Sequence, residues 1–136
     1  MKQYTKLIGR ESELIKEQLK EFLKQSKEEY QKSKNESLSN IERRAYFQQA
    51  SEKLYKVMIH VIEIKSGYNI RSHSDLFDSF YWQQANFHSE TMETFLSRMN
   101  LLHSYFYEGG IYPSYGVERS YKNLLDYINE IIDRFE

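Results

Sequence analysis

Three side chains in the last third of the chain are suited to chemistry on a phosphodiester bond. Arg98, His103 and Tyr105 lie close together in one short segment. Arginine keeps its charge and offers a planar fork of donors that fits a phosphate group. Histidine titrates near neutral pH and can remove or deliver a proton without a metal. Together with the phenol of the tyrosine, these groups predict a site for phosphodiester cleavage or for nucleotide binding.

The spacing of Arg98 and His103 does not bring them together within one straight helix. Five residues turn a side chain by roughly 500°, which leaves the two about 140° apart around the helix axis. His103 falls at the edge of an apolar stripe, whereas Arg98 shares another face with Leu101 and Tyr105. A symmetric dimer or a local bend or widening of the helix would bring them closer. Without either, His103 is a histidine at the edge of the core and Arg98 is a surface cation.

Several other residues are weaker candidates for binding a substrate. Arg43 and Arg44 precede two aromatic residues near a predicted helix start, a pattern that could bind a phosphate and stack a base. A solvated first helical turn explains these arginines more simply. Asn100 and Tyr107, which lie close to His103 in the sequence, are further candidates of the same kind.

Two more histidines have simpler structural explanations. His60 interrupts an apolar run, and we interpret it as a satisfied histidine of the core or of an interface. Arg71 and His73 flank a predicted helix start, where free backbone N–H groups could bind an anion. Capping of that helix by Ser72 or Ser74 accounts for the same pattern.

The elements that must position these side chains are helices. Apolar residues recur with helical spacing in four long segments and one short segment, and no useful stretch alternates with a period of two. The second long segment has clear ends, because Ser39 and Glu42 fit a capping box and Gly67 suits the position just after a helix. The predicted helices cover roughly residues 11–32, 39–66, 72–81, 89–108 and 117–135. The apolar stripe of the fourth is Met92, Phe95, Leu96, Met99, Leu102 and Phe106.

These patterns predict an all-α fold: an up-and-down bundle of four long helices plus one short helix, formed by residues 1–136 as a single domain. With 136 residues, 40% of them hydrophobic and 29% charged, the chain can bury one ordinary core. The net charge of −1 gives no overall basic field that would attract nucleic acid. The chain has no cysteine, which excludes disulfides and thiolate ligands.

Neither a metal site nor a membrane segment is expected. No set of His, Asp and Glu residues has the spacing of metal ligands on one helix face. The longest apolar stretch, residues 57–62, is far too short to span a bilayer, and the N-terminus lacks the apolar run of a signal peptide. We therefore expect a cytoplasmic protein that needs no cofactor.

Four stretches of the sequence, two of which overlap, resemble one known group of proteins. The spacing from Arg98 to His103, with Tyr105 two residues later, is similar to the Arg-x4-6-His motif of HEPN domains (higher eukaryotes and prokaryotes nucleotide-binding). Its tyrosine matches the variant found in HEPN toxins that are encoded beside a minimal nucleotidyltransferase. Residues 49–56 and 102–108 resemble the PaREP group of HEPN-like archaeal proteins, and residues 72–76 resemble the start of a HEPN third helix.

The resemblance implies a helical homodimer and a metal-independent endoribonuclease. By position, His103 would assist attack of a ribose 2′-hydroxyl on the adjacent phosphate, and Arg98 would stabilise the charge that develops there. Tyr105 would hold the substrate. In toxin–antitoxin members this tyrosine is also where the partner nucleotidyltransferase attaches adenylyl groups. A composite site at the dimer cleft would bring together the arginine and histidine that one helix holds apart.

A non-catalytic module is the alternative that the resemblance leaves open. Active HEPN ribonucleases usually carry a polar residue directly after the arginine, and here that position is Met99. Some HEPN domains are catalytically silent and serve in binding or dimerisation. On this second hypothesis the protein dimerises and binds a nucleotide or a partner protein, such as a nucleotidyltransferase.

Overall fold

The computed structural model of the chain describes residues 3–87, 89–108 and 115–134. Every regular element in these ranges is a helix, and a single antiparallel bridge joins Lys6 to Tyr68. The predicted all-α helical bundle is therefore confirmed. None of the helices described is both long and apolar enough to cross a lipid bilayer.

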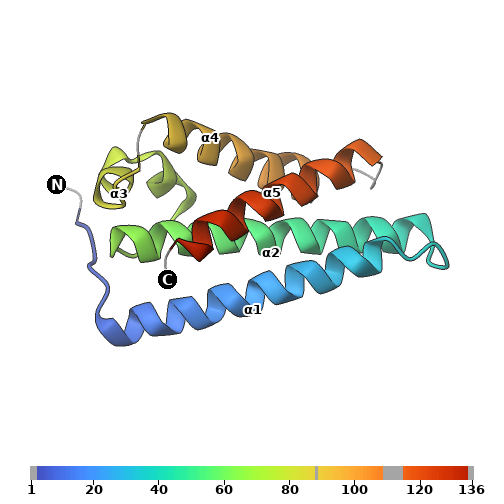
Figure 1. The fold of residues 1–136 in the computed structure, drawn as a ribbon, viewed down its shortest axis with the longest axis horizontal. Coiled ribbons are helices and arrows are strands. Elements are labelled where there is room, and N and C mark those ends of the chain that lie inside the picture. The colour runs from blue at the N-terminus through green and yellow to red at the C-terminus, as the bar shows by residue number, and fades with distance from the viewer. Residues whose placement is uncertain (1–2, 88, 109–114, 135–136) are drawn as a thin grey trace.

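Helices α1 (Gly9–Ser33) and α2 (Asn40–Ser66) form a long antiparallel pair that runs the length of the molecule (Figure 1). The ends of α2 are those that the sequence predicts. The Ser39 hydroxyl accepts a hydrogen bond from the Glu42 backbone N–H at 3.2 Å, and the Glu42 carboxylate accepts one from the Ser39 N–H at 3.4 Å. Gly67 ends the helix with φ of +80°, a left-handed conformation in which glycine is favoured because it has no Cβ.

The predicted short third helix is in fact two pieces. A 3₁₀ helix, η1 (His73–Phe77), is followed by a six-residue α-helix, α3 (Ser79–Gln84). The break occurs at Asp78, whose backbone is extended and whose carboxylate caps α3 by accepting from the Phe80 N–H at 3.0 Å. The residues of both pieces were predicted to be helical, but helical periodicity alone cannot detect a cap inside so short a segment.

Helix α4 (Ser89–Asn100) begins at the predicted residue and continues directly into a π-helix, η2 (Leu101–Glu108). The predicted end of this helix, Gly109-Gly110, lies outside the described residues. A π-helix bonds each N–H to the carbonyl five residues back, so its turn is wider than that of an α-helix. The predicted helix is therefore α-helical only as far as Asn100. The local widening of the helix, which was one of the alternatives considered from the sequence, occurs in η2.

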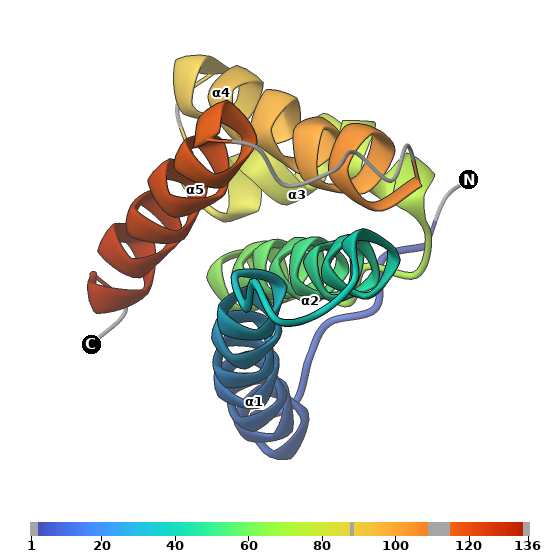
Figure 2. The same cartoon turned by 90° about the vertical axis from the view of Figure 1, so that its right-hand side faces the viewer.

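Helix α5 (Tyr115–Asp133) crosses the α1–α2 pair obliquely and approaches α4 at one end (Figures 1 and 2). Tyr121 fastens it to α1. The Tyr121 hydroxyl lies 2.5 Å from the Ser26 hydroxyl, and its ring stacks on Tyr30 with ring centroids 4.4 Å apart. Burial raises the pKa of the Tyr121 phenol far above its ordinary value, so the phenol is neutral at physiological pH.

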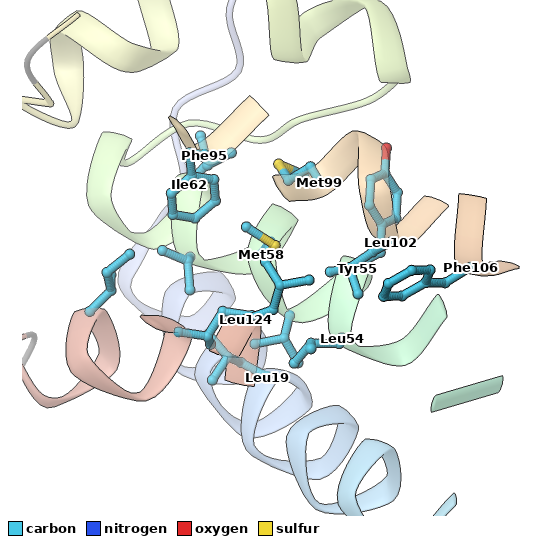
Figure 3. Close-up of a cluster of buried hydrophobic side chains, with 14 of the residues drawn as sticks. Leu19, Leu54, Tyr55, Met58, Ile62, Phe95, Met99, Leu102, Phe106 and Leu124 are labelled. Carbon is cyan, nitrogen blue, oxygen red and sulfur yellow. The ribbon is translucent and has the colours of Figure 1, made fainter. Parts of the chain in front are cut away.

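The core forms around α2, which packs against α1, α3, η2 and α5. Figure 3 shows side chains from α1, α2, α4, η2 and α5 meeting in one cluster. Of the stripe predicted for the fourth helix, four residues are buried and two, Met92 and Leu96, are only half-buried. The labelled cluster consists of Leu19, Leu54, Tyr55, Met58, Ile62, Phe95, Met99, Leu102, Phe106 and Leu124.

Candidate functional site

The His103 ring lies against two residues of α2. It stacks on the ring of Tyr55, with centroids 4.6 Å apart and planes at 23°. Its Nδ1 is 3.4 Å from Oε2 of Glu52, a longer contact than an ordinary N–H···O bond of roughly 2.7–3.2 Å. A carboxylate oxygen accepts hydrogen bonds, so for a neutral imidazole this contact favours the tautomer with its hydrogen on Nδ1 and its lone pair on Nε2. Nε2 is thus the atom suited to remove a proton.

A second histidine, His73, meets the same ring. The centroids of His73 and His103 are 4.8 Å apart with the rings perpendicular, and His73 also lies edge-on to Tyr55 at 5.6 Å. His73 is exposed and belongs to η1, whereas His103 belongs to η2. Two imidazoles in contact can serve as base and acid for a single substrate, provided that one is neutral and the other protonated.

The segment that leads into η1 is tied to Asp75. The Asp75 carboxylate accepts from the backbone N–H groups of Arg71, at 2.9 Å, and of Ser72, at 3.4 Å, both of which precede the helix. The hydroxyls of Ser72 and Ser74 lie 2.9 Å from each other. The competing explanation, capping of the helix start, is therefore supported. The capping box involves Ser72 and the Asp75 carboxylate.

A small cavity opens beside the two histidines, between η1 and the junction of α4 with η2. Its volume is about 190 Å³, below the roughly 300–1,000 Å³ of pockets that enclose drug-sized ligands. It can therefore take a group such as a phosphate or a sugar hydroxyl, but not a whole nucleotide. Its lining residues are Tyr55, His73, Leu76, Phe77, Leu96, Met99, Asn100, His103 and Ser104.

Two of the weaker sequence candidates lie next to His103. Asn100 lines the cavity, and its side-chain oxygen accepts a hydrogen bond from the Ser104 hydroxyl at 2.9 Å. The ring of Tyr107 is roughly parallel to that of His103, with centroids 6.0 Å apart. The Tyr107 carbonyl accepts from the Gln48 side chain of α2 at 3.1 Å, which ties η2 to α2 next to the site.

Arg98 lies on the other side of α4. Its guanidinium carbon is 4.5 Å from the centroid of the Tyr127 ring in α5, a cation–π contact. Burial raises the pKa of Tyr127, and the nearby charge of Arg98 partly offsets this rise. Arg98 and His103 line different cavities, so one chain does not bring them together. The angular argument from the sequence is confirmed, and the π-helix, which begins three residues after Arg98, does not reverse it.

The cavity at Arg98 is the larger of the two. Its volume is about 510 Å³, and it lies between α4 and α5. Its walls mix hydroxyl, amide, charged and apolar side chains, and they consist of Glu93, Thr94, Ser97, Arg98, Leu101, Ser120, Asn123 and Leu124.

The remaining predicted residues differ in their positions. The side chain of Tyr105 lies outside the described part of the structure. Arg43 donates from Nε to the Ser33 carbonyl at 2.8 Å, so it supports the α1–α2 connection. Arg44 is exposed, and helical spacing puts it on nearly the same side of α2 as Tyr55, three turns away. Of the two arginines, only Arg44 projects from the side of α2 that carries the site.

Sequence reasoning missed the partners of His103 on α2. Glu52 and Tyr55 belong to a stretch that was noted only for its resemblance to the PaREP group, and neither has a local signal of function. Glu52 is 51 residues from His103, and only helix packing joins them. The prediction that His60 is a satisfied histidine is confirmed, because its Nδ1 pairs with Oε1 of Glu63 at 2.7 Å.

The site thus brings the imidazoles of His103 and His73 into contact, with the Glu52 carboxylate against the first of them. No group of three or more His, Cys, Asp or Glu side chains that could hold a metal ion occurs within the described ranges. Comparison with protein-family models, with curated proteins and with solved structures found no match to this chain.

Proposed function

We propose that this protein is a HEPN-like endoribonuclease that cleaves RNA by proton transfer, without a metal ion, at a site centred on His103. The observation that carries the proposal is the position of His103, between the Glu52 carboxylate and the His73 ring and beside a cavity of about 190 Å³. The resemblance of the segment from Arg98 to Tyr105 to the HEPN motif supports the same reaction class.

The proposed reaction is attack of a ribose 2′-hydroxyl on the adjacent phosphorus. His103 takes the hydroxyl proton at Nε2 while the 2′-oxygen forms its bond to phosphorus. The bond from phosphorus to the 5′-oxygen breaks, and a protonated His73 gives its proton to that oxygen. The products are a 2′,3′-cyclic phosphate and a free 5′-hydroxyl. Asn100 lines the cavity that the phosphate and ribose hydroxyl would enter, and the Tyr107 ring lies beside that of His103.

A second copy of the chain completes the site in this proposal. The phosphate gains charge as the attacking oxygen approaches, and a guanidinium is the group best suited to stabilise it. Within one chain Arg98 faces α5, so the arginine that meets His103 comes from the partner in a homodimer. Tyr105 holds the substrate strand, as the resemblance implies.

The test is cleavage of labelled total RNA in EDTA by purified protein. The wild type should produce 2′,3′-cyclic phosphate ends, and His103→Ala should lose roughly 10²–10⁴-fold in rate, the usual contribution of a general base. The matched control is His60→Gln, which removes a histidine–carboxylate pair formed within α2 by His60 and Glu63. Circular dichroism of each variant confirms that the bundle is folded. Retained cleavage by His103→Ala would contradict the proposal.

The cavity at Arg98 favours a second candidate function. At about 510 Å³ it falls within the usual range for small-molecule sites, and it holds Arg98 away from His103. On this alternative the protein is a non-catalytic module that binds a nucleotide between α4 and α5, or partners a nucleotidyltransferase. Calorimetric titration with AMP tests it. Binding that Arg98→Ala abolishes, in a protein that cleaves no RNA, would favour this candidate.

A further inference from the structure

Phe77 is a large apolar side chain that the fold leaves in solvent. It is 73% exposed, whereas its neighbour Leu76 is 3% exposed. It also lines the cavity that holds His73 and His103. Single exposed apolar residues are common on protein surfaces and need no explanation by themselves. An exposed aromatic ring at the rim of a candidate catalytic cavity is a different case, because the position points to contact with whatever enters the cavity.

The backbone on both sides of Phe77 is held firmly. Before it, the Trp82 indole donates to the Leu76 carbonyl at 2.8 Å in a buried hydrogen bond. After it, the Asp78 N–H donates to the Asp75 carbonyl at 3.0 Å, which closes the last turn of η1. The ring is thus presented from a fixed position, and a fixed group loses little conformational entropy when it binds a partner.

The size of the cavity determines where the rest of a substrate must lie. A space of about 190 Å³ admits the phosphate and the ribose hydroxyl that react, but it cannot enclose the attached base. The base must therefore rest outside, on the rim. Phe77 offers an aromatic face there, and every nucleic-acid base stacks on such a face regardless of sequence.

We infer that Phe77 is a stacking platform for one base of a single-stranded RNA, next to the phosphate that is cleaved. This inference rests on the proposed function and names its substrate class. Bases in a duplex are already stacked on each other, so a platform of this kind selects single strands, loops and bulges. The net charge of −1 gives no general attraction to the phosphate backbone, which leaves local contacts such as stacking to supply affinity.

The test measures binding separately from cleavage. Fluorescence anisotropy follows a labelled single-stranded RNA whose 2′-hydroxyls are replaced by fluorine, so that the attacking group is missing. We expect Phe77→Ala to weaken binding about tenfold and Phe77→Leu to weaken it similarly, because leucine keeps the apolar bulk but not the aromatic face. Phe77→Trp should bind as the wild type does. Ile41→Ala, which removes another exposed apolar side chain, should change nothing; Ile41 is 82% exposed.

A companion measurement on cleavable RNA separates this inference from the proposed function. Phe77→Ala should raise KM about tenfold and change kcat much less, because stacking positions the strand and transfers no proton. If the wild type cleaves RNA while Phe77→Ala alters neither binding nor KM, the platform is overturned and the ribonuclease stands. If RNA binds in a Phe77-dependent way but is never cleaved, the proposed ribonuclease activity is wrong, whereas Phe77 is still a stacking platform for single-stranded RNA. A wild type that binds no single-stranded RNA overturns the platform.

Contact between two copies of the chain is the competing use of an exposed phenylalanine. Light scattering of the wild type and of Phe77→Ala, without RNA, reports it directly. Equal masses for the wild type and Phe77→Ala would support the role of Phe77 as a stacking platform. A smaller mass for Phe77→Ala identifies the ring as a contact between copies and overturns it.

Discussion

At the scale of single residues, the setting of His103 depends on a pair of α2 residues one turn apart. Tyr55 covers one face of the imidazole, and Glu52 meets its Nδ1. The tyrosine fixes the plane of the ring, and the carboxylate fixes the tautomer. Both effects prepare Nε2 to accept a proton, so each can be tested without removing the histidine itself.

Glu52→Gln should slow RNA cleavage while leaving the fold intact. Glutamine offers both a donor and an acceptor, so it no longer requires the hydrogen of His103 to sit on Nδ1. We expect kcat to fall roughly 10- to 100-fold, less than the roughly 10²–10⁴-fold expected when the base itself is removed. Glu29→Gln is the control, because Glu29 is also half-buried and pairs with Lys53 at 3.2 Å. Equal losses in the two variants would show that Glu52 acts only through stability.

A second residue-scale prediction concerns stability. The Tyr30 hydroxyl is buried and has no hydrogen-bond partner among the described residues. Burial, and to a smaller extent the charge of Glu118, raises its pKa. Because the phenol is desolvated without a bond in return, Tyr30→Phe should leave the free energy of unfolding unchanged or raise it by up to about 1 kcal/mol. Urea unfolding measures this, and a loss beyond about 1 kcal/mol would reveal a partner for the hydroxyl.

At the scale of elements, a buried hydroxyl pair helps to attach α5 to α1, together with the stacking of Tyr121 on Tyr30. Ser26 donates to the Ala50 carbonyl at 2.7 Å, so the Tyr121 hydroxyl must donate to Ser26 at 2.5 Å. The chain of donors therefore runs from α5 through α1 to α2. Removing the middle member should harm the fold more than removing the first, since it orphans a buried donor.

We therefore expect Ser26→Ala to cost about 1–3 kcal/mol in the free energy of unfolding, and Tyr121→Phe about 1 kcal/mol. The first leaves a buried phenol without its acceptor, while the second leaves Ser26 still bonded to Ala50. Urea unfolding of both variants and of the double variant gives the comparison. A larger loss for Tyr121→Phe would reverse the assigned donor order.

The buried Tyr121 phenol of α5 should also make the stability of the fold depend on alkaline pH. Burial raises the pKa of Tyr121 above its ordinary 10.0, so the folded protein holds this proton more tightly than the unfolded chain does. The stabilisation is fully present below pH 10.0 and is lost as the pH rises above that value. Urea midpoints should therefore fall across this range for the wild type, and fall less for Tyr121→Phe. An equal pH dependence in both would place the alkaline sensitivity elsewhere.

At the scale of the whole molecule, the separation of Arg98 and His103 makes dimerisation a requirement of the proposed site. Arg98 contacts α5 and His103 contacts α2, on different sides of the helix formed by α4 and η2. A symmetric pair of such helices could place the arginine of one copy beside the histidine of the other. The mass of the protein in solution, by light scattering, should be that of a dimer.

Mixing two inactive variants tests whether the site is shared. Arg98→Ala and His103→Ala should each be inactive alone. After subunit exchange, half of the dimers are mixed, and each mixed dimer has one site with both side chains intact. The mixture should therefore recover about a quarter of wild-type activity. Arg43→Ala mixed with His103→Ala is the dilution control, because it should keep about half of wild-type activity whether or not subunits exchange. No recovery, with exchange shown by differently tagged copies, would place the whole site in one chain.

Local sequence patterns determined most of the elements of this protein. The helical spacing of apolar residues located α1, α2, α4 and α5, and the capping box at Ser39 with Gly67 located both ends of α2. These features depend on residues three or four positions apart, which is why they can be predicted without the fold. The same local geometry showed that Arg98 and His103 leave their helix in different directions.

Only the tertiary structure decided which residues surround His103. Glu52, Tyr55 and His73 reach it across helix contacts, whose register depends on how the side chains of two surfaces interlock. The wide turn of η2 rotates each following residue by less than an α-helix would, and this too sets what faces α2. No periodic pattern within one segment encodes the rotation or the sliding of one helix against another. The sequence could therefore single out His103 as a candidate, whereas the residues around it could be found only from the packing of the bundle.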